Sequence, residues 1–210
     1  MVCTCKYKTP QGFDDMWMSS DGEVLTGLWF EGSRGLLKHR LDCAERDVPV
    51  FRETRRWLDI YFSGRQPDFT PSYRMDGLTP FRREVVEAML AIPFGETATY
   101  GDIAAALAKK HGIAKMSAQA VGGAVGWNPI CIIVPCHRVV GAKRSLVGYG
   151  GGIKNKVGLL SLESRCPAKP TVPSHTCSTA QAPFAEAKGR ICVIHRTPLP
   201  DGCGESGEAP

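Results

Sequence analysis

Residues 130–140 read Ile-Cys-Ile-Ile-Val-Pro-Cys-His-Arg-Val-Val and form the most informative stretch of the sequence. An apolar run leads into a Pro-Cys-His-Arg turn, after which the apolar residues continue. His137 and Arg138 are neighbours of the kinds that lower the pKa of a thiol and raise its thiolate fraction. Cys136 is therefore a candidate nucleophile. The alternative is an inert cysteine, because adjacent side chains often point apart. Cys131 is interpreted as a small buried hydrophobic residue.

The preceding residues 99–128 predict two helices joined by a short turn. Thr99 and Asp102 have the spacing of a capping box, and Ser117 can cap a second helix over 118–125. That second helix is rich in Ala, Val and Gly, although each Gly costs about 1 kcal/mol of helix stability relative to Ala. This composition favours either tight packing against another helix or close approach to a bulky backbone such as a phosphodiester chain.

The N-terminal part of the sequence predicts a separate α/β unit. Residues 13–31 alternate loosely between apolar and polar side chains about a two-residue turn at Asp21-Gly22, which is typical of a β-hairpin. Residues 50–62 have the apolar spacing of a helix. Pro, Gly, Ser and Thr then dominate residues 64–78, as in a connection between domains.

A second unit opens at Thr79-Pro80, which suit the N-cap and first position of a helix. Beyond Cys136, the glycine-rich residues 148–152 predict a flexible loop or one that lies close to a flat ligand, and residues 154–163 predict a final helix. The predicted division is an N-terminal α/β domain over 1–78, a second domain over 79–165, and a tail over 166–210. The tail holds four of the nine cysteines, and its composition predicts disorder or a weak interaction arm.

Positive charge is concentrated in the second domain. Residues 79–165 hold 11 Lys and Arg against 5 Asp and Glu, whereas residues 1–78 hold 11 against 12 and residues 166–210 hold 4 against 4. A local positive excess suits a polyanion such as a nucleic acid, although an ordinary solvated face gives the same count. No apolar stretch approaches the roughly 18 residues of a membrane helix, and no signal-peptide core is present, so a cytosolic or nuclear protein is expected.

Several motifs occur together in one order. They are Ala120-Val121-Gly122-Gly123-Ala124, Asn128-Pro129, Pro135-Cys136-His137-Arg138-Val139-Val140, Gly148-Tyr149 and Gly151-Gly152, with Tyr100, Leu159-Leu160 and Glu163 in register. Through these residues the sequence resembles the methylated-DNA–protein-cysteine methyltransferases, the O6-alkylguanine-DNA alkyltransferases of direct DNA repair. The resemblance covers roughly residues 6–165, and its central motif is far more specific than a generic helix-turn-helix.

The resemblance implies an α+β fold with two domains. They are a small ribonuclease-H-like α/β N-terminal domain and a helical C-terminal domain with a winged-helix-type helix-turn-helix. It further implies that the second helix of the pair enters the minor groove of double-stranded DNA, and that the damaged guanine is flipped out of the duplex into a pocket. The DNA-binding residues that it implies are Gln119, Ala120, Gly122, Gly123 and Arg138.

The implied reaction is an irreversible, single-turnover transfer of the alkyl group from O6-alkylguanine in DNA to Cys136, with O4-alkylthymine as a second candidate substrate. His137 takes the thiol proton through a water, and Glu163 orients the imidazole. Tyr100 matches the family's proton donor to the guanine ring, and Asn128 matches the residue that braces the turn. Taken singly, these side chains have simpler interpretations: an exposed helix charge for Glu163, a packed ring for Tyr100 and a turn former for Asn128.

Substrate recognition is also implied by the resemblance. The carbonyl of Val139 and the amide of Gly150 match groups that recognise the base edge, and Tyr149 is carried over as a further substrate-binding residue. No cofactor and no membrane partner are implied. The expected state is a monomer in the cytoplasm, or in the nucleus of a eukaryotic host.

The sequence departs from the family pattern at three points. Gln119 stands where the family commonly has an arginine that replaces the flipped base. The chain also continues for 45 residues beyond Arg165, where the family usually stops soon after the matched glutamate. No metal site is expected, although four side chains have ligand-capable spacing: Cys3, Cys5, His39 and Cys43.

Two other classes of protein are compatible with parts of this pattern. A DNA-binding protein that senses lesions without repairing them would lack an acceptor thiol, and Cys136 argues against it. A cysteine hydrolase would need an oxyanion hole and would turn over repeatedly, and nothing else in the sequence supports one.

Overall fold

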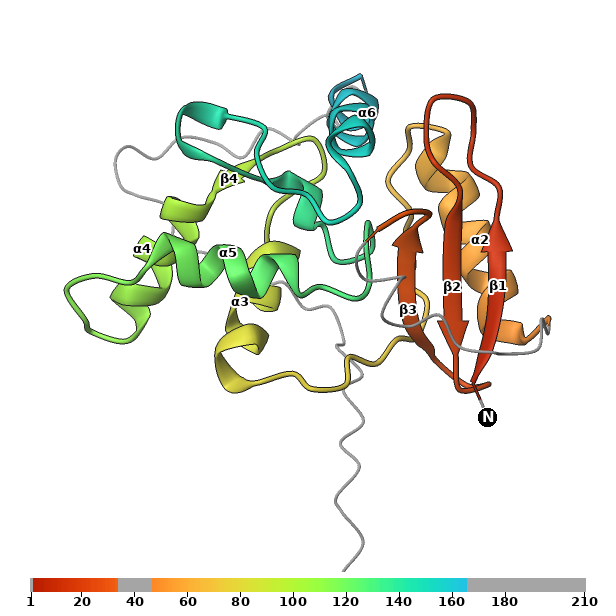
Figure 1. Cartoon of the computed structure of the whole chain (residues 1–210), viewed down its shortest axis with the longest axis horizontal. Helices are drawn as coiled ribbons and strands as arrows, with labels where there is room; N and C mark the ends of the chain where they lie inside the picture. The colour runs from red at the N-terminus through yellow and green to blue at the C-terminus, as the bar shows by residue number, and fades with distance from the viewer. Residues whose placement is uncertain (1, 34–46, 166–210) are drawn as a thin grey trace, which may run out of the picture.

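A computed structural model describes residues 2–33 and 47–165 of the chain. Its N-terminal part holds a three-stranded antiparallel sheet in the order β1 (Cys3–Tyr7), β2 (Met16–Ser20), β3 (Leu25–Phe30). Helix α2 (Pro49–Phe62) covers one face of this sheet (Figure 1). Phe51, Leu58 and Phe62 of this helix are buried, so the amphipathic helix predicted over 50–62 is confirmed.

The hairpin predicted over 13–31 is confirmed as β2 and β3, but its turn is longer than the predicted two residues. Ser20 pairs with Leu25, with a register irregularity after Ser19, so four residues connect the strands. The carboxylate of Asp21 accepts hydrogen bonds from the backbone amides of Glu23 and Val24, at 3.1 and 3.0 Å. This local bonding stabilises a wider turn than the sequence pattern indicates.

The helical part consists of α3 (Pro80–Leu90), α4 (Tyr100–Lys110), α5 (Ala118–Gly126) and α6 (Ile153–Ser164). The predicted caps are present. Thr79 and Ser117 each accept a hydrogen bond from a first-turn amide, and Thr99 and Asp102 form both bonds of a capping box, at 3.0 and 2.8 Å. The helix pair predicted over 99–128 is therefore confirmed.

A short parallel strand pair links two distant parts of this helical region. β4 (Ala98–Thr99) pairs with β5 (Val139–Val140), and the 3-10 turns η1 (Cys136–Arg138) and η2 (Ala142–Arg144) lie on either side of β5. Because β4 leads directly into α4, this pairing ties the start of the helix pair to the segment that follows Cys136. Strands of two residues are too short to leave a periodic pattern in a sequence.

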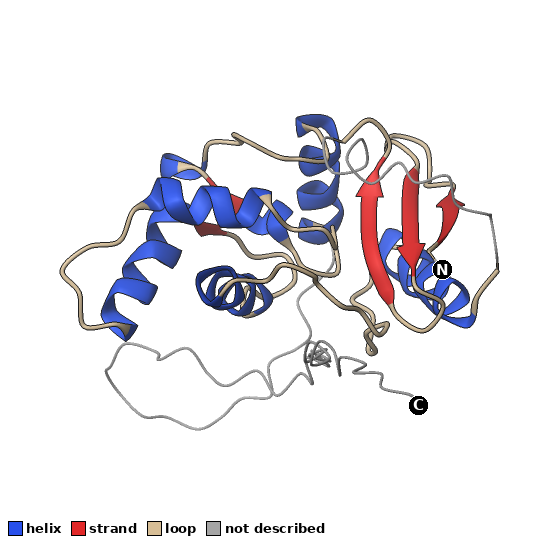
Figure 2. Ribbon diagram, turned by 60° about the horizontal axis from the view of Figure 1, so that its bottom comes forward, coloured by secondary structure: helices blue, strands red, loops and turns tan. Residues whose placement is uncertain are grey.

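The sheet and the helical part share one hydrophobic core. The amide of Leu28 in β3 donates to the carbonyl of Pro129 at 2.8 Å, and the amide of Cys131 donates to the carbonyl of Leu28 at 2.9 Å. Helix α6 lies between the two parts (Figures 1 and 2), where Asn155 exchanges hydrogen bonds with Asp14 at 3.0 and 2.8 Å. The α+β fold class expected from the sequence is therefore confirmed.

No helix in residues 2–33 and 47–165 is long and apolar enough to cross a membrane. The tail predicted over 166–210 lies outside the described residues, as do His39 and Cys43.

Candidate active site

Cys136 is the first residue of the turn η1, and it is 6% exposed. The side-chain amide of Asn128 donates to Cys136 Sγ at 3.1 Å and to the carbonyl of Val134 at 2.9 Å. The same side chain accepts a hydrogen bond from the amide of Ile130 at 3.0 Å. Asn128 therefore holds the loop between Ile130 and Cys136 at three points, which places it where a residue that braces the turn has to be.

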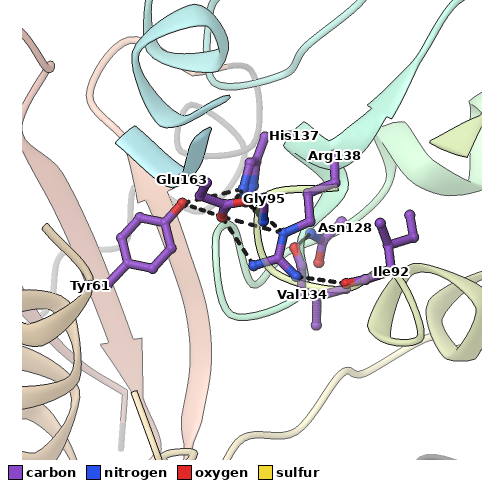
Figure 3. Close-up of polar contacts among 8 residues, drawn as sticks. All are labelled: Tyr61, Ile92, Gly95, Asn128, Val134, His137, Arg138 and Glu163. Atoms are coloured by element: carbon purple, nitrogen blue, oxygen red, sulfur yellow. Dashed lines mark hydrogen bonds and ion pairs between the residues drawn. The ribbon is translucent and has the colours of Figure 1, made fainter. Parts of the chain in front are cut away.

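His137, the next residue of η1, forms a buried pair with Glu163 from α6. His137 Nε2 lies 2.8 Å from Glu163 Oε1, and both side chains are fully buried (Figure 3). The second carboxylate oxygen accepts a hydrogen bond from the amide of Gly95 at 3.1 Å. Nδ1 of His137 is also buried and has no protein hydrogen-bond partner among the described residues. Nδ1 is thus the ring nitrogen that the pairing with Glu163 leaves without a protein partner among the described residues.

Arg138 supplies the positive charge of this cluster. Its guanidinium donates to Glu163 at 2.9 and 3.0 Å and to the carbonyl of Ile92 at 2.7 Å (Figure 3). The side chain is 11% exposed, and the guanidinium lies over the ring of Phe94. The DNA contact expected for Arg138 stays a prediction, and the hydrogen bonds of its guanidinium described here go to the buried carboxylate and to the carbonyl of Ile92.

The pKa values of the pair follow from burial and from this ion pair. Burial alone raises the pKa of Glu163, but the hydrogen bonds and charges of His137 and Arg138 lower it to about 2. Burial lowers the pKa of His137, and this effect outweighs the opposing influence of Glu163. At neutral pH the cluster therefore contains a carboxylate, a guanidinium and a neutral imidazole.

The pKa of the Cys136 thiol is lowered, and hydrogen bonding by the thiol of Cys131 is the largest cause. Burial opposes the shift, whereas Asn128 and the ammonium of Lys156 add to it. Cys131 is itself 5% exposed, as expected for a small buried residue. A thiol with a lowered pKa has a larger thiolate fraction and is a better nucleophile near neutral pH.

Lys156 and Tyr61 also belong to the site, and the sequence analysis did not identify either. Lys156 is fully buried in α6, and its Nζ donates to the carbonyl of Val139 at 2.6 Å. The hydroxyl of Tyr61, from α2, lies 2.7 Å from Glu163 Oε1. Lys156 lies four residues after the glycine-rich loop, and an interior lysine among apolar positions was the available signal. Tyr61 belongs to an ordinary core pattern that carries no such signal.

A groove with a volume of about 1530 Å³ runs beside the site. Its lining residues include Tyr100, Asn128, Cys131, Tyr149 and Gly150, whereas Cys136 is not among them. Tyr100 is half-buried, and its hydroxyl donates to the carbonyl of Gly148 at 3.3 Å. Burial and then the charge of Cys136 raise the pKa of Tyr100, so its proton is retained at neutral pH. Val139 is buried and is not among the lining residues.

Helix α5 forms another wall of the groove. Its lining residues are Ala118, Gln119, Gly122, Gly123 and Gly126, and Gln119 is the only long side chain among them. A Cβ atom added at Gly123 or Gly126 would have no heavy atom within 4 Å, so this surface is open. The helix therefore presents its backbone to whatever occupies the groove. Ala120 is exposed but is not among the lining residues.

The four residues considered for zinc are only partly described. Cys3 is buried in β1, and Cys5 Sγ accepts a hydrogen bond from Arg55 at 2.7 Å. Their potential partners His39 and Cys43 lie outside the described residues. Among the residues that the structure describes, no three His, Cys, Asp or Glu side chains form a group able to hold a metal ion.

Residues 80–165 match the family model described as "6-O-methylguanine DNA methyltransferase, DNA binding domain". The methylated-DNA–protein-cysteine methyltransferase of Mycobacterium tuberculosis is 49% identical over 116 residues, which is 55% of this chain and 67% of the relative. The enzyme of the same name from Haemophilus influenzae is 36% identical over 160 residues, which is 75% of this chain and 83% of the relative.

Solved structures agree with the sequence comparisons. The crystal structure of Mycobacterium tuberculosis OGT in complex with DNA is similar with a TM-score of 0.63 and 38% identity, covering 78% of this chain and 92% of that chain. The O6-methylguanine-DNA methyltransferase from Pyrococcus kodakaraensis has a TM-score of 0.52 and 30% identity, covering 78% and 99%. On the length and identity of these matches, the chain belongs to the family of methylated-DNA–protein-cysteine methyltransferases.

Proposed function

We propose that the chain removes an alkyl group from O6-alkylguanine in double-stranded DNA and transfers it to Sγ of its own Cys136. The observation that carries this assignment is the position of that sulfur. It receives a hydrogen bond from Asn128 at 3.1 Å and precedes a histidine paired with Glu163 at 2.8 Å. The chain belongs to the family of methylated-DNA–protein-cysteine methyltransferases, and the proposed transfer is in keeping with that name. The site supplies a thiol, a base and an orienting carboxylate.

The reaction is a single displacement at carbon. The thiol proton of Cys136 passes through a water to Nδ1 of His137, and the sulfur forms a bond to the alkyl carbon as the bond from that carbon to O6 of guanine breaks. The electron pair of the broken bond goes to guanine, and Tyr100 gives the ring a proton. Tyr100 then regains a proton from water and the imidazolium releases one to water, so the net result moves one proton from the thiol to guanine. The thioether is stable in water, so each molecule acts once.

The buried charges support this order of events. Because Arg138 already neutralises Glu163, His137 can remain neutral until it accepts the thiol proton. The imidazolium then lies 2.8 Å from a carboxylate and is stabilised by it. Nδ1 of His137 has no hydrogen-bond partner among the described residues that would compete for the proton.

We further propose that duplex DNA binds in this groove of the protein, with the minor groove of the DNA against α5. The open surface at Gly123 and Gly126 permits close backbone approach, and Gln119 is the long side chain able to enter the space of a flipped base. In this arrangement the protein acts as a monomer with a domain boundary near residue 78. Its substrate places it in the cytoplasm, or in the nucleus of a eukaryote.

Mass spectrometry of the intact protein after mixing with duplex DNA containing O6-methylguanine tests the proposal. A stable gain of one methyl group on the peptide that contains Cys136 supports repair. DNA binding with no change in mass would instead indicate a lesion sensor, and repeated turnover would indicate a hydrolase.

A further inference from the structure

Three side chains meet around Oε1 of the buried Glu163 carboxylate: Tyr61, His137 and, with Nη2 at 3.0 Å, Arg138. Tyr61 of α2 lies with its hydroxyl oxygen 2.7 Å from Glu163 Oε1, and His137 Nε2 lies 2.8 Å from the same oxygen (Figure 3). The third side of this triangle, from the Tyr61 oxygen to His137 Nε2, is 3.3 Å. The segments involved are 76 and 102 residues from Tyr61 in sequence.

The positions of the hydrogens follow from the acceptors available. An ionised carboxylate only accepts hydrogen bonds, so the single hydroxyl hydrogen of Tyr61 points to Glu163. The Tyr61 oxygen then presents a lone pair to His137 Nε2. If Nε2 carried no hydrogen, its lone pair would face two oxygen atoms, which is electrostatically unfavourable. The arrangement therefore favours the tautomer with hydrogen on Nε2 and a free lone pair on Nδ1.

The ring of Tyr61 is held so that this hydroxyl has little freedom. Tyr61 is 1% exposed and stacks on Trp57 with ring centroids 5.4 Å apart and planes within 7°. The Tyr61 ring also makes T-shaped contacts with the rings of Phe94 and Phe62, whose centroids lie 5.9 and 5.6 Å from its own. Burial raises the pKa of Tyr61 far above its ordinary value, so the hydroxyl stays protonated and remains a donor.

We propose that Tyr61 is a positioning residue for the alkyl transfer, which holds His137 in the tautomer whose Nδ1 accepts the Cys136 proton. The inference rests on the proposed function of Cys136. It also assigns α2 of the N-terminal part a task in the reaction, because this helix supplies the hydroxyl. Glu163 alone also favours the tautomer with hydrogen on Nε2. Tyr61 therefore increases the population of a tautomer that the carboxylate already favours.

Tyr61→Phe tests the proposal, and Tyr7→Phe is its matched control. Tyr7 is also buried, and its hydroxyl also donates to a carboxylate at 2.7 Å, but that carboxylate is Asp59, outside the catalytic cluster. Both variants remove one hydroxyl from a buried ring of the same part of the protein. Single-turnover methyl transfer should slow about tenfold in Tyr61→Phe, far less than the roughly 10⁴-fold loss when a triad loses its orienting carboxyl function. Tyr7→Phe should keep the wild-type rate.

Nitrogen-15 NMR of the His137 ring supplies a readout that simple packing would not move. Wild-type protein should give the shifts of a neutral ring with hydrogen on Nε2. Tyr61→Phe should show averaged shifts and a changed pH profile of transfer, with Tyr7→Phe unchanged. Hydrogen on Nδ1 in the wild-type protein would overturn the proposal, as would equal effects of the two variants or an unchanged ring signal and rate in Tyr61→Phe. Because the tautomer is measured without substrate, its result is independent of whether Cys136 is the acceptor.

Discussion

Arg138 neutralises Glu163 inside the protein: Nε lies 2.9 Å from Oε2, Nη2 lies 3.0 Å from Oε1, and the carboxylate is fully buried. The charge of the orienting carboxylate is thus balanced by a guanidinium and not by an imidazolium. Many activated cysteines depend on a positively charged histidine beside the thiolate. Here the geometry leaves His137 uncharged before the reaction, so it can serve as a proton acceptor when substrate is bound.

Replacement of Cys136 with serine should abolish methyl transfer and leave folding and lesion binding largely intact. An unactivated hydroxyl is a far poorer nucleophile than a thiolate near neutral pH. Intact-protein mass after incubation with duplex O6-methylguanine measures the transfer. Cys5→Ser is a suitable control, because Cys5 lies in β1 and contacts Arg55. A methyl group gained by Cys136→Ser, on serine or on another cysteine, would show that the Cys136 thiol is dispensable.

Asn128→Ala should both destabilise the protein and raise the pKa of the Cys136 thiol. The truncation removes the hydrogen bond to Sγ and leaves the buried amide of Ile130 and carbonyl of Val134 without this partner. Each buried group left unpaired costs about 1–3 kcal/mol. Chemical denaturation measures the first effect, and the pH dependence of iodoacetamide labelling at the Cys136 peptide measures the second. Ser117→Ala, which removes a helix cap on α5, should lower stability without shifting that labelling curve.

The local features of the fold were predictable from the sequence, and the contacts between distant elements were not. Thr99 and Ser117 act on amides within their own helices, so their spacing alone predicts their role. Tyr61 has the spacing of a core residue, and only the placement of α2 beside α6 brings its hydroxyl to Glu163. The sequence pattern is silent on such an encounter because it involves residues 102 positions apart.

Arg138 illustrates the same limit in the opposite direction. The family resemblance implies DNA contact for Arg138, whereas its guanidinium donates to Glu163 and to the carbonyl of Ile92. The candidate residues Cys136, His137 and Glu163 could be named from the sequence because the family resemblance fixes their register. Their protonation states required the burial and ion pair that only the structure provides.

Acidification should weaken the protein through Glu163. Its pKa falls from an ordinary 4.5 to about 2 in the folded state, so its stabilising contribution is fully present above pH 4.5 and is lost as the pH falls toward 2. The size of this contribution is up to about 3 kcal/mol. Glu163→Gln should be strongly destabilised at pH 7, because the buried Arg138 loses its counterion.

The difference between wild type and Glu163→Gln should shrink as the pH approaches 2. Urea denaturation of both proteins from pH 7 downward measures this convergence. His137 also contributes to acid sensitivity in both proteins, since burial lowers its pKa in the folded state and unfolding releases it to bind a proton. Parallel curves for the two proteins below pH 4.5 would mean that Glu163 is not the titrating group.

Gln119→Arg tests the orientation of α5 on DNA. Gln119 is exposed on the wall of the groove, where a planar amide can fill part of the space left by a flipped base. Arginine adds a fixed positive charge in the negative potential of DNA, and its guanidinium stacks better on flanking bases. We expect tighter binding, a salt dependence steeper by about one phosphate equivalent, and a modest increase in the transfer rate on duplex DNA.

Paired measurements separate extrusion of the base from pocket chemistry. Single-turnover rates are compared on duplex O6-methylguanine and on free O6-benzylguanine, which needs no flipping, and only the first should rise in Gln119→Arg. Ala105→Arg is the matched control, because it adds the same charge at an exposed position of α4 that does not line the groove and is not among the expected DNA-binding residues. It should not accelerate transfer on the duplex. If both substrates respond together, position 119 affects the pocket or stability and not extrusion. If neither rate nor salt dependence changes, Gln119 does not face DNA, and α5 is not the helix that enters the minor groove.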